Sequence, residues 1–82
     1  MAIASLIVRA DAGFEEQTVA AIEAVEGLSV HTITENKEII VLAEAPTLEA
    51  IGNLGSAVQE FHNVWSVTFA YANNEDLEPE MS

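Results

Sequence analysis

Histidine, cysteine and closely spaced carboxylates are the side chains that build most catalytic and metal sites, and this chain offers few such arrangements. It has two histidines, His31 and His62, and no cysteine. No paired spacing around either histidine resembles a set of metal ligands. The chain also lacks the G-x-G-x-x-G and Walker patterns that bind phosphate groups. The sequence therefore predicts that the protein is not an enzyme and binds no metal or cofactor.

Carboxylates are nevertheless abundant, with 14 Asp and Glu residues against two Lys and Arg residues and a formal net charge of −12. They are scattered over polar positions such as Glu15, Glu16, Glu35 and Glu60, where solvation explains them better than acid–base catalysis does. A strongly negative protein repels the phosphates of nucleic acid, so we expect no nucleic-acid partner. The charge favours a basic partner, unless it serves solubility alone.

The length bounds the size of the core. The 82 residues, half of them hydrophobic, can form one small domain. A domain this small buries only about 60% of its extended-chain surface, so an oligomer or a bound partner could add stability. No stretch is long enough to span a membrane, and no basic segment precedes an apolar one as in a secretory signal peptide. We therefore expect a cytoplasmic protein without membrane insertion.

Hydrophobic periodicity divides the chain into six expected elements. Alternating β-branched and aromatic residues predict strands, and apolar residues at helical spacing predict helices. The expected order is strand, helix, strand, strand, helix, strand, at residues 4–9, 14–25, 28–34, 38–43, 46–61 and 64–71. Residues 73–82 are acidic and have only Leu77 and Met81 to bury, so we expect a disordered tail after a single domain at 1–72.

The two halves of the chain resemble each other, because the order strand, helix, strand occurs twice. Two such units joined by a hairpin form an α+β fold, the ferredoxin-like βαββαβ arrangement. This fold has a four-stranded antiparallel sheet with two helices on one face. The other face of the sheet is then left open.

Alternation along each strand assigns its residues to one of these two faces. The expected core, on the helix side, is Leu6, Val8, Phe14, Ile22, Ile39, Val41, Ile51, Leu54 and Val58. The open face is expected to carry Ser5, Ile7, Arg9, His31, Ile33, Glu38, Ile40 and Leu42. In the last strand one of two alternating sets faces the helices, and we favour the large set over the small one: Trp65, Val67, Phe69 and Tyr71 rather than Ser66, Thr68 and Ala70. An apolar patch on so acidic a protein indicates an interface, and a homodimer packed sheet to sheet is one way to cover it.

Three segments carry a resemblance to a known family: Ser5 to Val8, Val25 to Gly27, and Val64 to Tyr71. Together with the element order and the acidic tail, they resemble the NapD family. The resemblance implies a cytoplasmic maturation chaperone that binds the twin-arginine signal peptide of the periplasmic nitrate reductase catalytic subunit. Such a chaperone holds back export until the molybdenum cofactor is inserted. The chain departs from the family pattern at Glu26, where members often have Pro, and at Asn63, where a second Gly is common.

The resemblance also implies a binding site. The family binds the signal peptide as a helix on the sheet, which carries the site onto the open-face residues Ser5, Ile7, Arg9, Ile40 and Leu42. A signal peptide brings two arginines and an apolar segment, which match an acidic protein with an apolar open face. Arg9 would repel those arginines unless it pairs with Glu38 or Glu44.

Two other classes of protein share this fold. A small dimeric ligand-sensing regulatory module would normally be attached to a DNA-binding or catalytic domain. A dimeric α+β-barrel enzyme would need a catalytic side chain inside a cavity, and only His31 or Tyr71 could serve.

Overall fold

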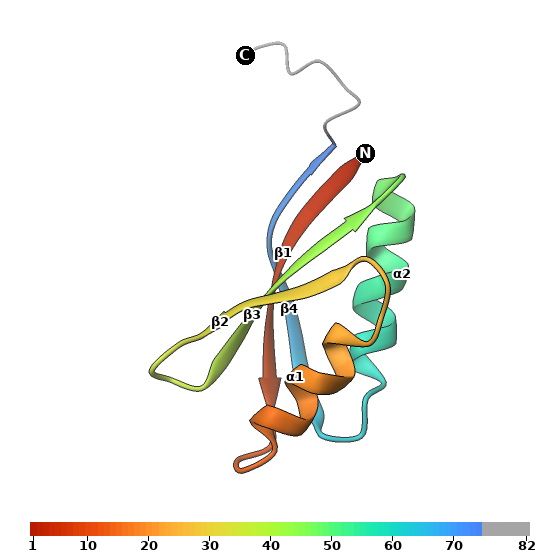
Figure 1. The fold of residues 1–82 in the computed structure, drawn as a ribbon. Coiled ribbons are helices and arrows are strands. Elements are labelled where there is room, and N and C mark those ends of the chain that lie inside the picture. Colours follow the sequence, from red (N-terminus) through yellow and green to blue (C-terminus); the bar gives the residue numbers. More distant parts are fainter. Residues whose placement is uncertain (75–82) are drawn as a thin grey trace.

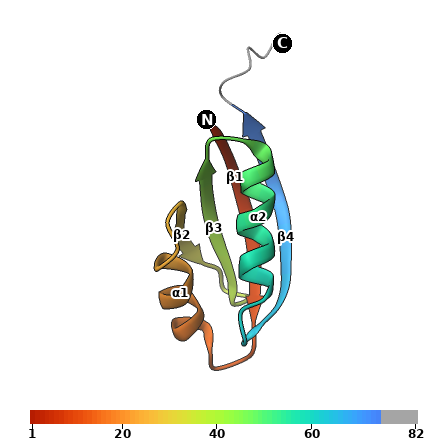
Figure 2. The same ribbon diagram turned by 90° about the vertical axis from the view of Figure 1, so that its right-hand side faces the viewer.

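The computed structural model of the protein describes residues 1–74. Its elements are β1 (Ala2–Ala10), α1 (Glu15–Glu23), β2 (Leu28–Ile33), β3 (Glu38–Ala45), α2 (Leu48–Gln59) and β4 (Val64–Asn74). The strands form one antiparallel sheet in the order β2-β3-β1-β4, so β1 and β3 are central. Both helices lie on the same side of this sheet (Figures 1 and 2). The predicted ferredoxin-like fold is confirmed.

The last strand is longer than expected. The backbone of Asn73 pairs with Ile3 and that of Asn74 pairs with Ala2, so β4 continues past the domain limit predicted at residue 72. The acidic tail was predicted to begin at residue 73, and its residues 75–82 lie outside the described residues.

The core lies between the sheet and the helices. Alternate residues of β1 and β3 are buried beneath the helical layer, and α2 packs over β1, β3 and β4 while α1 packs against β2. The predicted core residues that are buried are Leu6, Val8, Ile22, Ile39, Val41, Ile51 and Val58. Leu54 is partly buried against this cluster. These predictions of the core are confirmed.

Phe14 is not a core residue, contrary to the prediction. The helix begins at Glu15, and Phe14 is its N-cap residue with a non-helical backbone, so the helical period does not extend to it. Its side chain is 41% exposed. The backbone of Phe14 nevertheless stabilises the first turn of α1. Its carbonyl oxygen accepts hydrogen bonds from the backbone N–H of Thr18 (3.0 Å) and from Oγ1 of Thr18 (2.8 Å).

A β-bulge in β2 changes the face of one predicted residue. Val30 pairs with Val41 and Thr32 pairs with Ile40, so β2 has one more residue than β3 at this point. The extra residue shifts the alternation, and Ile33 pairs with Ile39 on the helix side of the sheet. The prediction that Ile33 belongs to the open face is therefore wrong.

A second bulge has the same effect on β4. Ala10 pairs with Val64 and Arg9 pairs with Ser66, which leaves Trp65 as the extra residue. Trp65 lies beside Arg9 rather than beneath the helices and is 60% exposed, so its predicted inward position is wrong. Val67 and Phe69 face the helices as predicted, since Val67 packs against the core and Phe69 against α2. The side chain of Tyr71 lies outside what the structure describes.

The open face of the sheet as candidate functional site

The face of the sheet that points away from the helices is uncovered by any other element of residues 1–74 (Figure 1). Residues that pair directly across antiparallel strands point to the same face, so the register defines this surface row by row. Ser5 pairs with Leu42, Ile7 with Ile40, and Arg9 with Glu38. The register therefore brings together all five residues of the predicted site, Ser5, Ile7, Arg9, Ile40 and Leu42.

One further residue of this face was missed in the sequence. Ile3 pairs with Glu44, so it continues the same row of β1 side chains beyond Ser5. The predicted strand began at residue 4, although the pair Ala2 and Ile3 already continues the alternation of buried and half-buried residues. That alternation is the signal that could have found Ile3.

We call the four aliphatic residues of this face the apolar strip: Ile3, Ile7, Ile40 and Leu42. All four are partly buried in the free chain. Side chains of the neighbouring strands pack beside them, but no other element of residues 1–74 covers this face of the sheet. Small hydroxyl residues occupy the same rows on the outer strands, with Ser29 and Thr32 on β2 and Ser66 and Thr68 on β4. The strip therefore follows the two central strands and has polar margins.

Arg9 lies at one end of the apolar strip. Nη2 of Arg9 donates a hydrogen bond to Oε2 of Glu38, and the two side chains form an ion pair. The guanidinium carbon of Arg9 also lies 5.9 Å from the centre of the Trp65 ring, within range of a cation–π interaction. Of the two carboxylates predicted as partners, Glu38 is the one that balances the charge of Arg9.

The turn between β2 and β3 positions Glu38. The backbone N–H of Thr34 donates to the carbonyl oxygen of Glu38 (2.8 Å), and that of Lys37 donates to the carbonyl oxygen of Thr34 (2.9 Å). The N–H of Glu38 donates to Oγ1 of Thr34 (3.1 Å). Lys37 has a positive φ of 67°, which lets the chain reverse direction within the turn. The side chain of Glu38 is thereby held in register with Arg9.

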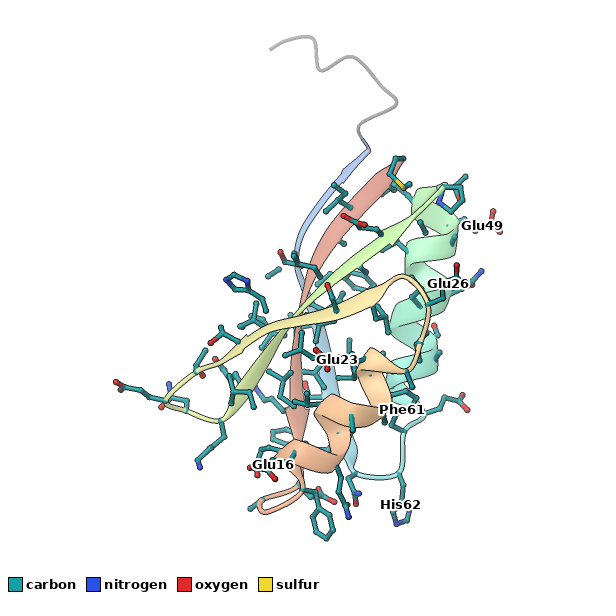
Figure 3. All side chains as sticks on the ribbon, in the orientation of Figure 1. Glu16, Glu23, Glu26, Glu49, Phe61 and His62 are labelled. Atoms are coloured by element: carbon teal, nitrogen blue, oxygen red, sulfur yellow. The ribbon has the colours of Figure 1, made fainter. Side chains whose placement is uncertain are left out.

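Three hollows among residues 1–74 lie away from the apolar strip, since none of its four residues lines them. One of about 520 Å³ lies between the end of β3 and α2, where Leu54 and Pro46 contribute to its lining together with Glu26 and Glu44. Figure 3 shows Glu49 on the first turn of α2, Glu26 beside that helix, and His62 in the loop after it. Within residues 1–74 no three His, Asp or Glu side chains are placed to hold a metal ion together. No helix in this part of the chain is long and apolar enough to cross a membrane.

The fold and the uncovered apolar face define a small ferredoxin-like domain with a surface suited to a partner. The family model for the NapD protein matches residues 1–76, so the chain belongs to the NapD family. Its fold is similar to the solution structure of the E. coli Tat proofreading chaperone protein NapD, with a TM-score of 0.78 and 22% sequence identity. That similarity covers 98% of this chain and 85% of the E. coli chain. No curated protein matches this chain.

Proposed function

We propose that this protein is a maturation chaperone that binds the twin-arginine signal peptide of the periplasmic nitrate reductase catalytic subunit. It would act in the cytoplasm and hold back export until the molybdenum cofactor is inserted into the reductase. Membership of the NapD family supports this function. The observation that carries the proposal is the apolar strip on the open face of a protein whose net charge is −12.

The proposed ligand complements this face in two ways. A helical signal peptide can lay its apolar side on the strip, which displaces water from Ile7, Ile40 and Leu42. Complete burial of such a side chain is worth about 1.5 to 3 kcal/mol, and these residues are already largely buried in the free chain, so each contributes at most about a third of that value. The two arginines of the peptide are attracted by the surrounding carboxylates.

The double variant Ile40→Glu with Leu42→Glu tests the proposal. Both side chains lie on the uncovered face, so the variant should keep the circular dichroism spectrum of the parent. It should bind the signal peptide at least 100-fold more weakly in calorimetry. Two carboxylates beneath the apolar segment must lose water, and this cost exceeds any attraction to the arginines.

A matched control separates the position of the new charges from their number. Ala20→Glu with Ala57→Glu adds the same two charges at exposed positions of the helices. This control should bind the peptide at least as tightly as the parent, because the added carboxylates attract the arginines without touching the strip. Equal binding by the parent and the open-face variant would place the site elsewhere. Sedimentation of the free parent reports whether two copies cover the face as a homodimer instead.

A further inference from the structure

The outer edge of β4 is unprotected. Within residues 1–74 this strand pairs with β1 alone and forms one margin of the sheet, with α2 beside it (Figure 2). Its eleven residues contain no Asp, Glu, Lys, Arg or Pro, although the chain has a net charge of −12. Charged side chains and Pro are among the features that keep an edge strand from pairing with another chain. The edge of β4 can therefore accept a further strand.

Two β-bulges limit the part of this edge that a further strand can follow. Trp65 is the extra residue of the first bulge, and Ala70 is the extra residue of the second. Between them residues 66–69 pair with β1 without interruption. On the opposite edge of the sheet, the bulge at His31 interrupts β2 after its third residue. The regular edge is thus short, and it lies in the middle of β4.

This part of the edge presents an aromatic ring next to a hollow. Phe69 lies on the helix side of β4 and is 48% exposed. A hollow of about 220 Å³ lies between β4 and α2, and Val67, Gly52 and Gly55 contribute to its lining. A Cβ atom at Gly52 would meet nothing within 4 Å, so the hollow is open on that side. The edge therefore offers both an apolar ring and a space beside α2 that a second ring can enter.

We propose that two copies of this chain associate through their β4 edges, with a two-fold axis at Thr68. The proposal is independent of the proposed function. Residues directly opposite on antiparallel strands share a face of the sheet. With the axis at Thr68, Val67 lies opposite Phe69 of the second copy, and the symmetry produces this pair twice. Each Phe69 ring then reaches the hollow beside Val67 of the other copy.

Self-complementarity favours a second copy as the occupant of this edge. The ring and the hollow belong to the same strand, so a single two-fold rotation places both rings at both hollows. The paired residues 66–70 carry no charge, and Glu60, the one charged residue that lines the hollow, is exposed to solvent. The contact is therefore uncharged although each copy is strongly acidic. Because the contact is small, the dimer should be weak and in exchange with the monomer.

Pairing through β4 joins the two sheets into one of eight strands. The two-fold axis is perpendicular to the joined sheet, so both apolar strips lie on the same face and stay uncovered. A homodimer packed sheet to sheet would instead cover them. The two arrangements therefore respond differently to substitutions on the edge and on the open face.

Cross-linking tests the position of the axis. The chain has no cysteine, so Thr68→Cys introduces a single thiol. Directly opposite Cα atoms on antiparallel strands are about 4.5 to 5.5 Å apart, which is within the range of a disulfide. Oxidation with diamide should link Thr68→Cys into dimers at least about tenfold faster than Thr32→Cys, because pairing raises the local thiol concentration. Thr32 is exposed on the other edge strand, and equal rates for the two variants would overturn the proposal.

Sedimentation equilibrium at roughly 10 µM to 1 mM tests the contact itself, because small interfaces are weak. Thr68→Lys places like charges opposite each other and should weaken association at least about tenfold, even though it reduces the net charge of each copy from −12 to −11. Thr32→Lys makes the same change on β2 and should associate like the parent. Gly52→Leu fills the hollow and should weaken association while the domain stays folded. A parent that is monomeric throughout, or a Thr68→Lys variant that associates like the parent, would overturn the proposal.

Salt and the open-face variant separate this dimer from other complexes. Added salt should strengthen association, because two copies with a net charge of −12 repel each other. This effect is opposite in sign to the one expected for binding of a basic peptide. At high salt, Ile40→Glu with Leu42→Glu should still associate like the parent. Loss of association in this variant, with Thr68→Lys unaffected, would assign the dimer to the open face and overturn pairing through β4.

Discussion

The ring of Phe69 on β4 lies directly against Gly55 of α2. A Cβ atom at Gly55 would stand 2.7 Å from Cζ of Phe69 and 3.2 Å from its Cε2, closer than side chains normally approach. The glycine thus provides the space that this ring occupies beside α2. The ring still remains 48% exposed, because β4 is an edge strand and α2 covers only one side of it.

Two glycines of α2 predict different effects of alanine. Alanine is favoured over glycine in a helix by about 1 kcal/mol. A Cβ atom at Gly52 would meet nothing within 4 Å, so Gly52→Ala should raise the free energy of unfolding by about that amount. Gly55→Ala must first displace the Phe69 ring, so it should gain less or lose stability. Urea denaturation of both variants measures the difference, and equal gains would show that Phe69 does not pack on Gly55 in solution.

The glycine before β2 is predicted to be less replaceable. Gly27 has a φ of +95°, and a Cβ atom there would lie 2.8 Å from the carbonyl oxygen of Glu44. Its own carbonyl oxygen accepts a hydrogen bond from the N–H of Glu44 (2.8 Å), so the backbones cannot separate freely. Gly27→Ala should lower the free energy of unfolding by about 2 kcal/mol or more, because left-handed strain of about 1 to 2 kcal/mol adds to the close contact.

Gly13→Ala is the matched control for this prediction. Gly13 has a φ of +89° but nothing within 4 Å of a Cβ atom, so its replacement carries the backbone strain alone. The melting temperature of Gly13→Ala should therefore be higher than that of Gly27→Ala. The opposite ranking would mean that β2 and β3 do not approach as closely at Gly27 as described.

The two faces of β1 predict opposite responses to a new charge. Leu6 is completely buried and Ile22 packs in the same core, so Leu6→Asp or Ile22→Asp should unfold the domain by burying an unpaired charge. Ile7→Asp changes the neighbouring residue on the open face and should remain folded. Circular dichroism melts compare the three variants. A Leu6→Asp variant that melts like the parent would reverse the assignment of the helix-facing side.

The sequence was sufficient for the fold because local patterns and the global arrangement agree. Alternation along β1 and β3 predicts which residues pair on each face, and the pairs Ser5 with Leu42 and Ile7 with Ile40 follow from it. The candidate site could therefore be assembled from alternation and the hairpin. Ile3 was lost only because the start of the strand was placed too late.

The errors have a different physical origin. Ile33 follows the β-bulge in β2, and Trp65 is the extra residue of the β-bulge in β4. A bulge is a property of the pairing between two strands, so the sequence of one strand alone does not predict it. One extra residue reverses the faces of those that follow, so strict alternation fails there. The prediction that Phe14 belongs to the core was wrong for another reason. Phe14 is apolar and stands at helical spacing, but the helix begins only after it, at Glu15.

Salt should weaken binding of the signal peptide only in part. In the proposed complex the net charge of −12 would attract the arginines of the peptide. Exposed ion pairs are worth about 0.2 to 1 kcal/mol each and are screened over about 8 Å at physiological ionic strength. The apolar contact that we propose with Ile7, Ile40 and Leu42 would not depend on such screening. Calorimetric titrations at low and high salt should therefore show a partial loss of affinity that levels off.

A peptide with both arginines replaced by glutamate provides the reference for this titration. The glutamate peptide should bind more weakly than the parent peptide at low salt. The difference in affinity between the two peptides should become smaller as salt is added. Complete insensitivity of the parent peptide to salt, or tighter binding of the glutamate peptide, would remove charge complementarity from the mechanism. Persistence of parent binding at high salt would then assign the remaining affinity to the apolar strip, because that contact alone survives screening.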